Sequence, residues 1–251
     1  MSTARLLLRQ VRWENRSFWR TPESAFFTFA FPLIFMVIIN LVFASAFDDE
    51  GGSIIDFYTP AIIAFAIVNA SFTTLAMTVA IARDEGLLKR VHGTPMPTVT
   101  YLSARVGHSI LMGLLLSAIV ALFGAMFYGV DLRADALPAL VLTLALGAAS
   151  FAALGLAAAG LIPSSQSAPA IVNAIVLPLL FISNIFIRVE EGILATIAGL
   201  FPVRHFADAL QAVYHPDVAG PLDPLDLAWV VGWGIAGLLV AWRTFSWEPR
   251  G

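Results

Sequence analysis

The sequence contains no cysteine and few charged residues, and both shortages narrow what the protein can be. Without cysteine there is no disulfide, no thiolate metal ligand and no thiol chemistry. Charged residues make up only 12% of the 251 residues, whereas 59% are hydrophobic and the mean hydropathy is +0.85. Soluble domains do not have such a composition. The sequence therefore predicts an all-α integral membrane protein.

Motifs that would mark an enzyme or an ion-driven transporter are also missing. The sequence has no G-x-x-x-x-G-K-[ST] phosphate loop and no H-E-x-x-H zinc motif. The apolar segments carry no Asp, Glu, Lys or Arg near their middle, where ion-coupled transporters usually need a carboxylate. We therefore predict no catalytic residue, no metal site and no cofactor on this chain. Any energy for work must come from a partner.

What the sequence does contain is a series of apolar segments of about 20 residues, the length that crosses a bilayer as a helix. They predict a single transmembrane domain over 1–251, in which 1–24 form a cytoplasmic amphipathic helix. The six predicted membrane spans cover about 25–47, 57–82, 106–130, 136–162, 168–187 and 225–245. An acidic turn, Asp48-Asp49-Glu50, is expected to follow the first span.

The charged residues between these segments predict the orientation. With six spans, the side that holds both termini carries 11 of the 14 Lys and Arg residues, and the other side carries 12 of the 17 acidic residues. Because cytoplasmic loops are enriched in Lys and Arg, both termini are expected in the cytoplasm. The loop between the second and third spans is expected there too.

The N-terminal segment carries arginines at helical spacing. One stripe of a helix would hold Arg5, Arg9, Arg12, Arg16 and Arg20. Leu7, Val11 and Phe18 fall on the opposite side. This pattern is typical of a helix that lies in the membrane interface, with its arginines towards water or anionic lipid. A simple positive-inside anchor is the alternative, and a nucleic-acid partner is not expected.

The segment between the fifth and sixth spans is too apolar for an ordinary loop. Ile193 to Phe201 is about half a membrane long, and Val203 to Tyr214 has the pattern of an amphipathic helix. Arg204 and Asp208 form an i,i+4 pair on that helix. Two alternatives stay open: the two pieces are re-entrant helices that dip into the outer leaflet, or they form a cap on the membrane surface.

Polar and small residues also occur within the predicted spans. The asparagines among them, which are candidates for contact with a substrate along a translocation path, are Asn40, Asn69, Asn173 and Asn184. Hydrogen bonding between helices is the alternative role for them. Gly147, Gly155 and Gly160 in the fourth span indicate close helix packing.

The cytoplasmic stretch from Ile81 to Arg105 has a pattern of its own. On a short helix, Leu87, Leu88 and Val91 would share one face, which is expected to press against another surface. The charged residues around them are Arg83, Asp84, Glu85, Lys89 and Arg90.

This stretch resembles the signature that follows the second span in ABC-2 type transporter permeases. The residues that carry the resemblance are Arg83-Asp84-Glu85-Gly86-Leu87-Leu88-Lys89-Arg90, Thr94-Pro95 and Tyr101. A second stretch is similar to the family's Pro-containing segment before the last span: Leu200-Phe201-Pro202, His205 and Ala207-Asp208-Ala209-Leu210. Asn184 departs from the family's pattern, in which many members have a Ser-Gly pair.

The resemblance implies a permease of the bacterial cytoplasmic membrane that pairs with a second copy and with two ATPase subunits, which hold ATP and magnesium. Such assemblies export drugs, lipids or lipid-linked glycans. It further implies that residues 83–91 contact the ATPase as a coupling helix. The N-terminal helix, with Arg5, Arg9, Arg12 and Arg16, would be a second contact. An ion-coupled transporter and a non-transporting membrane scaffold remain alternatives from other classes.

Overall fold

The computed structural model describes residues 3–47, 54–94, 96–131, 133–186, 191–220 and 222–248, and every regular element within them is helical. The elements are α1 (Thr3–Trp19), α2 (Pro22–Phe47), α3 (Ile54–Val68), the π-helical η2 (Asn69–Thr73), α4 (Thr74–Asp84), α5 (Leu87–His92), α6 (Thr98–Tyr128), the 3-10 turn η3 (Ala134–Ala136), α7 (Leu137–Leu161), α8 (Ala168–Ile182), α9 (Ile193–Ala198), α10 (Pro202–Tyr214), α11 (Pro216–Ala219) and α12 (Pro224–Thr244). The predicted all-α class is confirmed. The predicted acidic turn at 48–50, Pro95 and the last residue of the fifth predicted span lie outside the described residues.

Five helical segments in the described part of the chain are long and apolar enough to cross a membrane. They are Ala25–Val42, Ile55–Asp84, Thr98–Tyr128, Ala134–Leu161 and Pro224–Thr244. The chain is therefore a multi-pass membrane protein. Prolines in the first turn of α7, α10 and α12 fix the backbone where each helix begins, at no cost in hydrogen bonds.

The fifth predicted span is shorter than the sequence suggests. α8 has 15 residues, a length of about 22 Å against the roughly 30 Å of a bilayer's hydrocarbon core. It ends at Ile182, and Asn184 then has a left-handed backbone with φ of 60°. The apolar run continues beyond this point in the sequence, but the helix does not.

The helix of the third predicted span begins earlier than predicted, within a polar part of the sequence. α6 starts at Thr98, directly after Pro97, whose backbone is extended. The prediction placed this span at 106 because hydropathy rises there. The preceding residues are helical as well, since Tyr101 is buried and Arg105 has partners within the chain.

α7 is the centre of the bundle and packs against α12, α6, α4 and η2. Small residues bring α7 and α12 together: a Cβ on Gly237 would lie 2.9 Å from the backbone nitrogen of Leu154. A Cβ on Gly160 would lie 2.3 Å from the hydroxyl of Thr244, at the last turn of α12. The glycines of the fourth span thus have the close-packing role that the sequence predicts.

The second span is interrupted by one π-helical turn, η2, whose Ser71, Phe72 and Thr73 are buried. A Cβ on Gly155 of α7 would lie 2.8 Å from the carbonyl oxygen of Phe72. The wider backbone of the π-turn is therefore accommodated where α7 has no side chain. The second span thus consists of α3, η2 and α4, which form one continuous helical segment.

α10 lies among the membrane-crossing helices, packed against α3, α12 and α7. Phe206 is fully buried and meets the ring of Phe151 at 5.4 Å between ring centroids. At the other end of α10, Gln211 donates a hydrogen bond of 2.8 Å to the carbonyl of Phe57 in the first turn of α3. The predicted amphipathic helix therefore buries its apolar face in the bundle.

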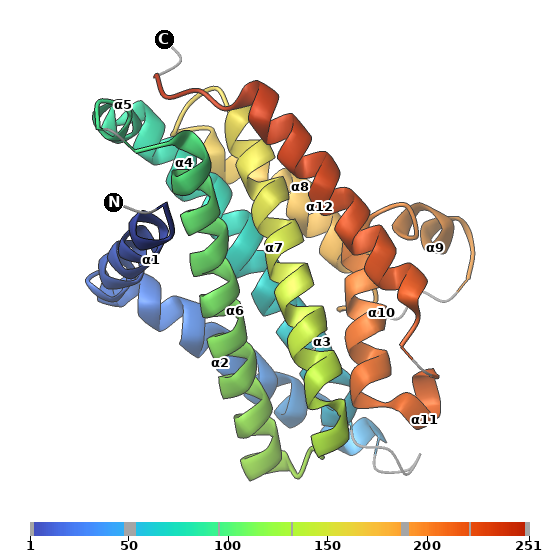
Figure 1. Cartoon of the computed structure of the whole chain (residues 1–251). Coiled ribbons are helices and arrows are strands. Elements are labelled where there is room, and N and C mark those ends of the chain that lie inside the picture. Colours follow the sequence, from blue (N-terminus) through green and yellow to red (C-terminus); the bar gives the residue numbers. More distant parts are fainter. Residues whose placement is uncertain are drawn as a thin grey trace.

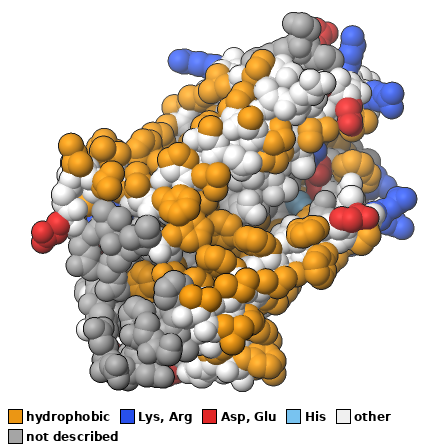
Figure 2. All heavy atoms as spheres, turned by 180° about the vertical axis from the view of Figure 1, so that it is seen from behind, with side chains coloured by type: hydrophobic (Ala, Val, Ile, Leu, Met, Phe, Trp, Pro, Cys, Tyr) orange, Lys and Arg blue, Asp and Glu red, His pale blue; other side chains and the backbone are white. Residues whose placement is uncertain are grey.

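The bundle has two distinct ends (Figure 1). α1, α5 and the last turn of α12 lie at one end, and α11 lies near the opposite end. Figure 2 shows that most of the visible Lys and Arg side chains gather at one end, while hydrophobic side chains cover much of the face between the ends. We call the end with α1 and α5 the basic end.

Candidate functional site

The short helix α5 (Leu87–His92) is held at the basic end by a tight turn. α4 ends at Asp84, and the turn to α5 contains Gly86 with a left-handed φ of 71°, a conformation that glycine adopts without strain. After α5 the chain reaches Pro97, which starts α6. α5 is thus a short polar helix between two membrane-crossing helices.

The structure separates the three apolar residues that were predicted to share one face pressed against another surface. Leu88 is 1% exposed and belongs to a cluster with Leu75, Tyr101 and Leu156 from α4, α6 and α7. Val91 is partly buried against the same cluster. Leu87, in contrast, is 44% exposed. Two of the three residues therefore hold α5 on the bundle, and one faces outwards.

The outer surface of α5 combines this leucine with charge. Lys89 and Arg90 are exposed, and so is Glu85 in the preceding turn. We call Glu85, Leu87, Lys89 and Arg90 the α5 surface. It is small, mixed in charge with an excess of cations, and carried on a helix whose other side is fixed.

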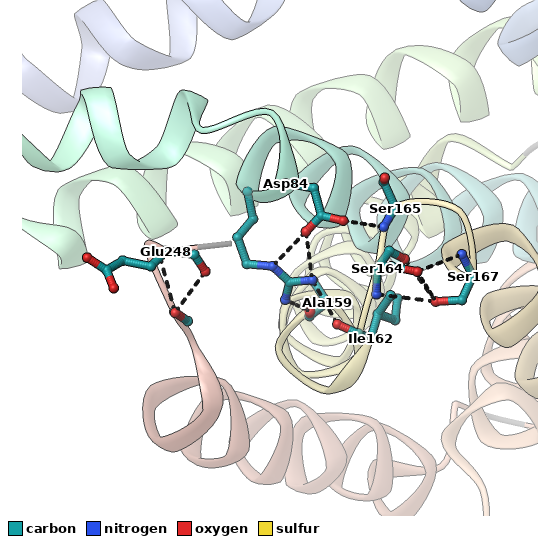
Figure 3. A network of polar contacts seen from close by, with 9 residues as sticks. Asp84, Ala159, Ile162, Ser164, Ser165, Ser167 and Glu248 are labelled. Carbon is teal, nitrogen blue, oxygen red and sulfur yellow. Dashed lines mark hydrogen bonds and ion pairs between the residues drawn. The ribbon is translucent and has the colours of Figure 1, made fainter. Parts of the chain in front are cut away.

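Arg83 and Asp84, which the sequence placed with the coupling residues, bind the chain itself (Figure 3). Arg83 is 2% exposed, and its guanidinium donates to the carbonyls of Ala159 at 3.0 Å and Ile162 at 2.8 Å. These carbonyls belong to the end of α7, where helix carbonyls have no intrahelical partner. Asp84 pairs with Arg83 at 3.3 Å and accepts a short hydrogen bond from the backbone N–H of Ser165.

This pair therefore ties the end of α4 to the turn between α7 and α8. The turn is further braced by hydrogen bonds between the hydroxyls of Ser164 and Ser167, 3.0 Å apart. α5 follows Asp84 after one turn, so this pair lies between α5 and the start of α8. The predicted second span ended at 82 and left Arg83 outside it, whereas α4 includes Arg83 in its last turn.

A second polar contact joins α1 to α6, and the sequence analysis missed it. Glu14 is 6% exposed and pairs with Arg105 at 3.1 Å. Arg105 also donates a 2.9 Å hydrogen bond to the hydroxyl of Tyr101, whose ring lies 5.6 Å from that of Trp247. The available clue was an acidic residue on the side of α1 that faces away from the arginines.

The arginines of α1 lie on its outward side, as their spacing predicts. Arg5, Arg9, Arg12 and Arg16 are all exposed. The opposite side packs on α6, where a Cβ on Gly107 would lie 3.5 Å from the side chain of Val11.

Three of the four asparagines predicted for a translocation path lie on three different helices, and the fourth lies in the turn after α8. Asn40 is half-buried on α2, Asn69 begins η2 and Asn173 is exposed on α8. Asn184 follows α8 and donates a 2.9 Å hydrogen bond to Asp208 of α10.

That contact belongs to a polar cluster around α9 and α10. Asp208 pairs with Arg204 at 3.4 Å, the i,i+4 pair that the sequence predicts. His205 lies 2.7 Å from Asp226 of α12 and 2.8 Å from the carbonyl of Gly199. Its ring stacks on that of Trp229. The described residues include no group of three or more His, Cys, Asp or Glu that could hold a metal ion.

Comparison with known proteins gives two findings. The family model of the ABC-2 type transporter matches residues 6–215, from α1 to the end of α10. The chain is also similar to the daunorubicin resistance ABC transporter permease protein DrrB1 of Streptomyces coeruleorubidus, with 29% identity over 197 residues. That alignment covers 73% of this chain and 66% of the relative, so this chain spans slightly less than two thirds of the relative's length.

Proposed function

Because the chain belongs to the ABC-2 type transporter family, we propose that it is the membrane-spanning permease subunit of an ATP-driven exporter. The family match over 6–215 carries this proposal, since it includes α5 and the residues that fix α5 to the bundle. The chain itself contains no phosphate-binding loop, so ATP and magnesium belong to a separate ATPase subunit. Two ATPase subunits and a second permease copy complete the assembly.

The α5 surface is the contact for the ATPase in this proposal. Leu87 supplies the apolar contact, and Lys89 and Arg90 supply charge at its edge. Leu88 and the Arg83–Asp84 pair supply rigidity, because a helix that slides on its own bundle transmits no movement. ATP-driven closure of the two ATPases displaces α5, and the bundle follows as a nearly rigid body that favours an outward-open state.

The chain crosses the membrane six times in this proposal, with the basic end in the cytoplasm. α8 begins beside Asp84 at the end of α4, and α10 ends beside Phe57 at the beginning of α3. Residues 168–214 therefore lead from one end of the second span to the other. α8 begins the fifth crossing at the basic end, and α10 completes it on the outer side. α9 and α10 are the short re-entrant helices, and they lie in the outer half of the membrane. The excess of Lys and Arg at the basic end supports this orientation.

The proposed cargo is a hydrophobic or amphipathic molecule, drug-like or lipid. The printed name of the relative refers to resistance to daunorubicin. The apolar surface of α8, where Leu177 and Phe181 are exposed on the same side as Asn173, suits such a cargo. Charged groups, which a strongly polar cargo would need, are not among the described residues of that helix.

Co-purification with the ATPase of the same transport system tests this function. We expect the two chains to form a stable complex whose ATP hydrolysis rises when a hydrophobic drug is added, and whose vesicles accumulate that drug. The purified permease alone should neither bind nor hydrolyse ATP. A permease that binds no ATPase, or that transports in the absence of ATP under an ion gradient, contradicts the proposal.

A further inference from the structure

We infer that the arginine face of α1, made by Arg5, Arg12 and Arg16, binds the phosphate groups of anionic lipids in the leaflet on the basic side. The family resemblance implies instead that these arginines meet the ATPase. The inference rests on the membrane topology proposed above, but not on the identity of the cargo or of the ATPase. It is argued from the direction of α1 and from what surrounds each side of it.

The contacts between α1 and α6 set the direction of α1. Val11, Glu14 and Phe18 all meet α6, and their partners are Gly107, Arg105 and His108. The eight residues of α1 from Val11 to Phe18 extend over about 10 Å of helix, whereas these three partners lie within four successive residues of α6. The two helices therefore cross steeply. Because α6 is long and apolar enough to cross a membrane, α1 lies along the membrane surface.

The sides of α1 then face different surroundings. Trp19 stacks on Phe29 of α2 with ring centroids 5.4 Å apart and planes within 6°, so this flank faces the apolar first span. Leu8 lies on the same flank and is 66% exposed. The arginine face is neither this flank nor the side that packs on α6. It points away from the bundle at the depth of Arg105 and His108, along the membrane surface.

At that depth the neighbours of an outward-pointing side chain are lipid headgroups. Arg5, Arg12 and Arg16 are exposed, and their guanidinium groups match phosphate in charge and geometry. Trp13, 58% exposed, borders this face on its other edge, and tryptophan is the residue that anchors helices at the membrane interface. An ATPase that docks on the end of the bundle meets the α5 surface, whereas the arginine face points sideways. The charge pattern and the crossing angle therefore both favour lipid.

The test compares lipid binding by the full-length chain and by two variants that lose the same charge. Arg5→Gln/Arg12→Gln/Arg16→Gln removes the arginine face. The matched control, Lys89→Gln/Arg90→Gln/Arg243→Gln, removes three other exposed cations. Each delipidated protein in detergent is titrated with phosphatidylglycerol or phosphatidylcholine, and native mass spectrometry counts the bound lipids. Gel filtration confirms that each variant is folded.

We expect the natural chain and the control to prefer phosphatidylglycerol, and the arginine-face variant to lose that preference by at least about tenfold, since each basic residue near an anionic surface contributes about fivefold. Equal loss in the control would show that only net charge matters and would overturn the inference. Retained preference in the arginine-face variant would do so as well. If the triple variant does not fold, the three single variants are compared in the same way, each with an expected loss of up to about fivefold.

A second measurement separates lipid from ATPase. The arginine-face variant should still co-purify with the ATPase in detergent, whereas loss of the ATPase with intact lipid preference would assign these arginines to the ATPase instead. Because the lipid titration contains no ATPase, a failure of the exporter proposal leaves its result interpretable.

Discussion

Single residues at the basic end have roles that their neighbours in the sequence do not share. Leu87 and Leu88 are adjacent, yet Leu88 is 1% exposed within the chain's own core and Leu87 is 44% exposed on the α5 surface. Arg83 and Arg90 are both basic, yet Arg83 is buried among the carbonyls at the end of α7, and Arg90 is exposed. The role of each side chain follows from the direction in which it leaves its helix.

Substitution of the two leucines should therefore affect different properties, stability for Leu88 and ATPase binding for Leu87. Leu88→Ala removes a buried side chain and should lower the free energy of unfolding by about 2–5 kcal/mol, visible as a lower melting temperature in detergent. Leu87→Ala should leave melting nearly unchanged and weaken binding of the ATPase by about 1–4 kcal/mol. Both properties are measured on the same preparations. Equal melting temperatures for the two variants would contradict this division.

Arg83 gives a second prediction at this scale. Arg83→Ala leaves the carbonyls of Ala159 and Ile162 buried without their donor, which should cost about 1–3 kcal/mol of stability. Fluorescence-detected gel filtration after heating measures the loss. Lys89→Ala, which removes an exposed cation six residues away in the sequence, serves as the control and should melt like the natural chain. A melting temperature of Arg83→Ala equal to that of the control would show that the pair with Asp84 contributes nothing to stability.

At the scale of elements, α7 is the helix against which the others are placed, and its small residues set the distances. Gly155 admits the π-turn η2, and Gly147 admits the ring of Phe206 from α10, 2.2 Å from where a Cβ would be. The ring of Phe206 is a buried side chain, whereas the neighbour of Gly155 is the backbone carbonyl of Phe72. At Gly155, therefore, added volume meets backbone, which cannot move without displacing its helix.

Replacement of two glycines by alanine tests this interpretation. Gly155→Ala brings a methyl group to 2.8 Å from the carbonyl oxygen of Phe72, and should lower the melting temperature because backbone must move. Gly232→Ala on α12 meets no atom within 4 Å and should be neutral or slightly stabilising, since alanine favours a helix over glycine by about 1 kcal/mol. Thermal melting of both proteins in the same detergent distinguishes them. A Gly155→Ala protein as stable as Gly232→Ala would mean that η2 is not held by α7.

For the whole molecule, the proposed topology has an even number of crossings only if α8 and α10 act together. α8 alone has 15 residues, too few for a bilayer, but residues 168–214 connect the basic end with the end where α3 begins. In this proposal the basic end, with the α5 surface and the end of α12, lies on the cytoplasmic side.

Single cysteines test the topology, because the natural chain has none that would react. In intact cells, Lys89→Cys on α5 should be protected from a membrane-impermeant maleimide, and Asp217→Cys on α11 should be labelled. Both side chains are exposed, so protection reports the membrane and not burial. After the cells are opened, both should react. Labelling of Lys89→Cys from outside would invert the orientation, and protection of both would require an odd number of crossings.

The fold class, the approximate positions of the membrane-crossing helices and the family resemblance could all be predicted from the sequence. These predictions depend on patterns that can be read along the chain. The patterns are runs of apolar residues, the distribution of Lys and Arg between the loops on the two sides of the membrane, and the local motif from Arg83 to Arg90. The helix over 203–214 and its pair Arg204–Asp208 were also predictable, because residues four apart on a helix are always neighbours.

Which of these residues face inwards depends on how the helices pack, and the sequence pattern does not show it. Periodicity shows that Leu87, Leu88 and Val91 lie near one another on a helix, but not which of them meets the bundle, because that depends on how the turn at Gly86 directs α5. The partners of Arg83 and Glu14 lie 76 or more residues away in the chain, on α7 and α6. Hydropathy likewise extended the fifth span beyond Ile182, where Asn184 turns the chain towards Asp208. Contacts between residues distant in the sequence depend on how helices pack, and a local pattern contains no information about that packing.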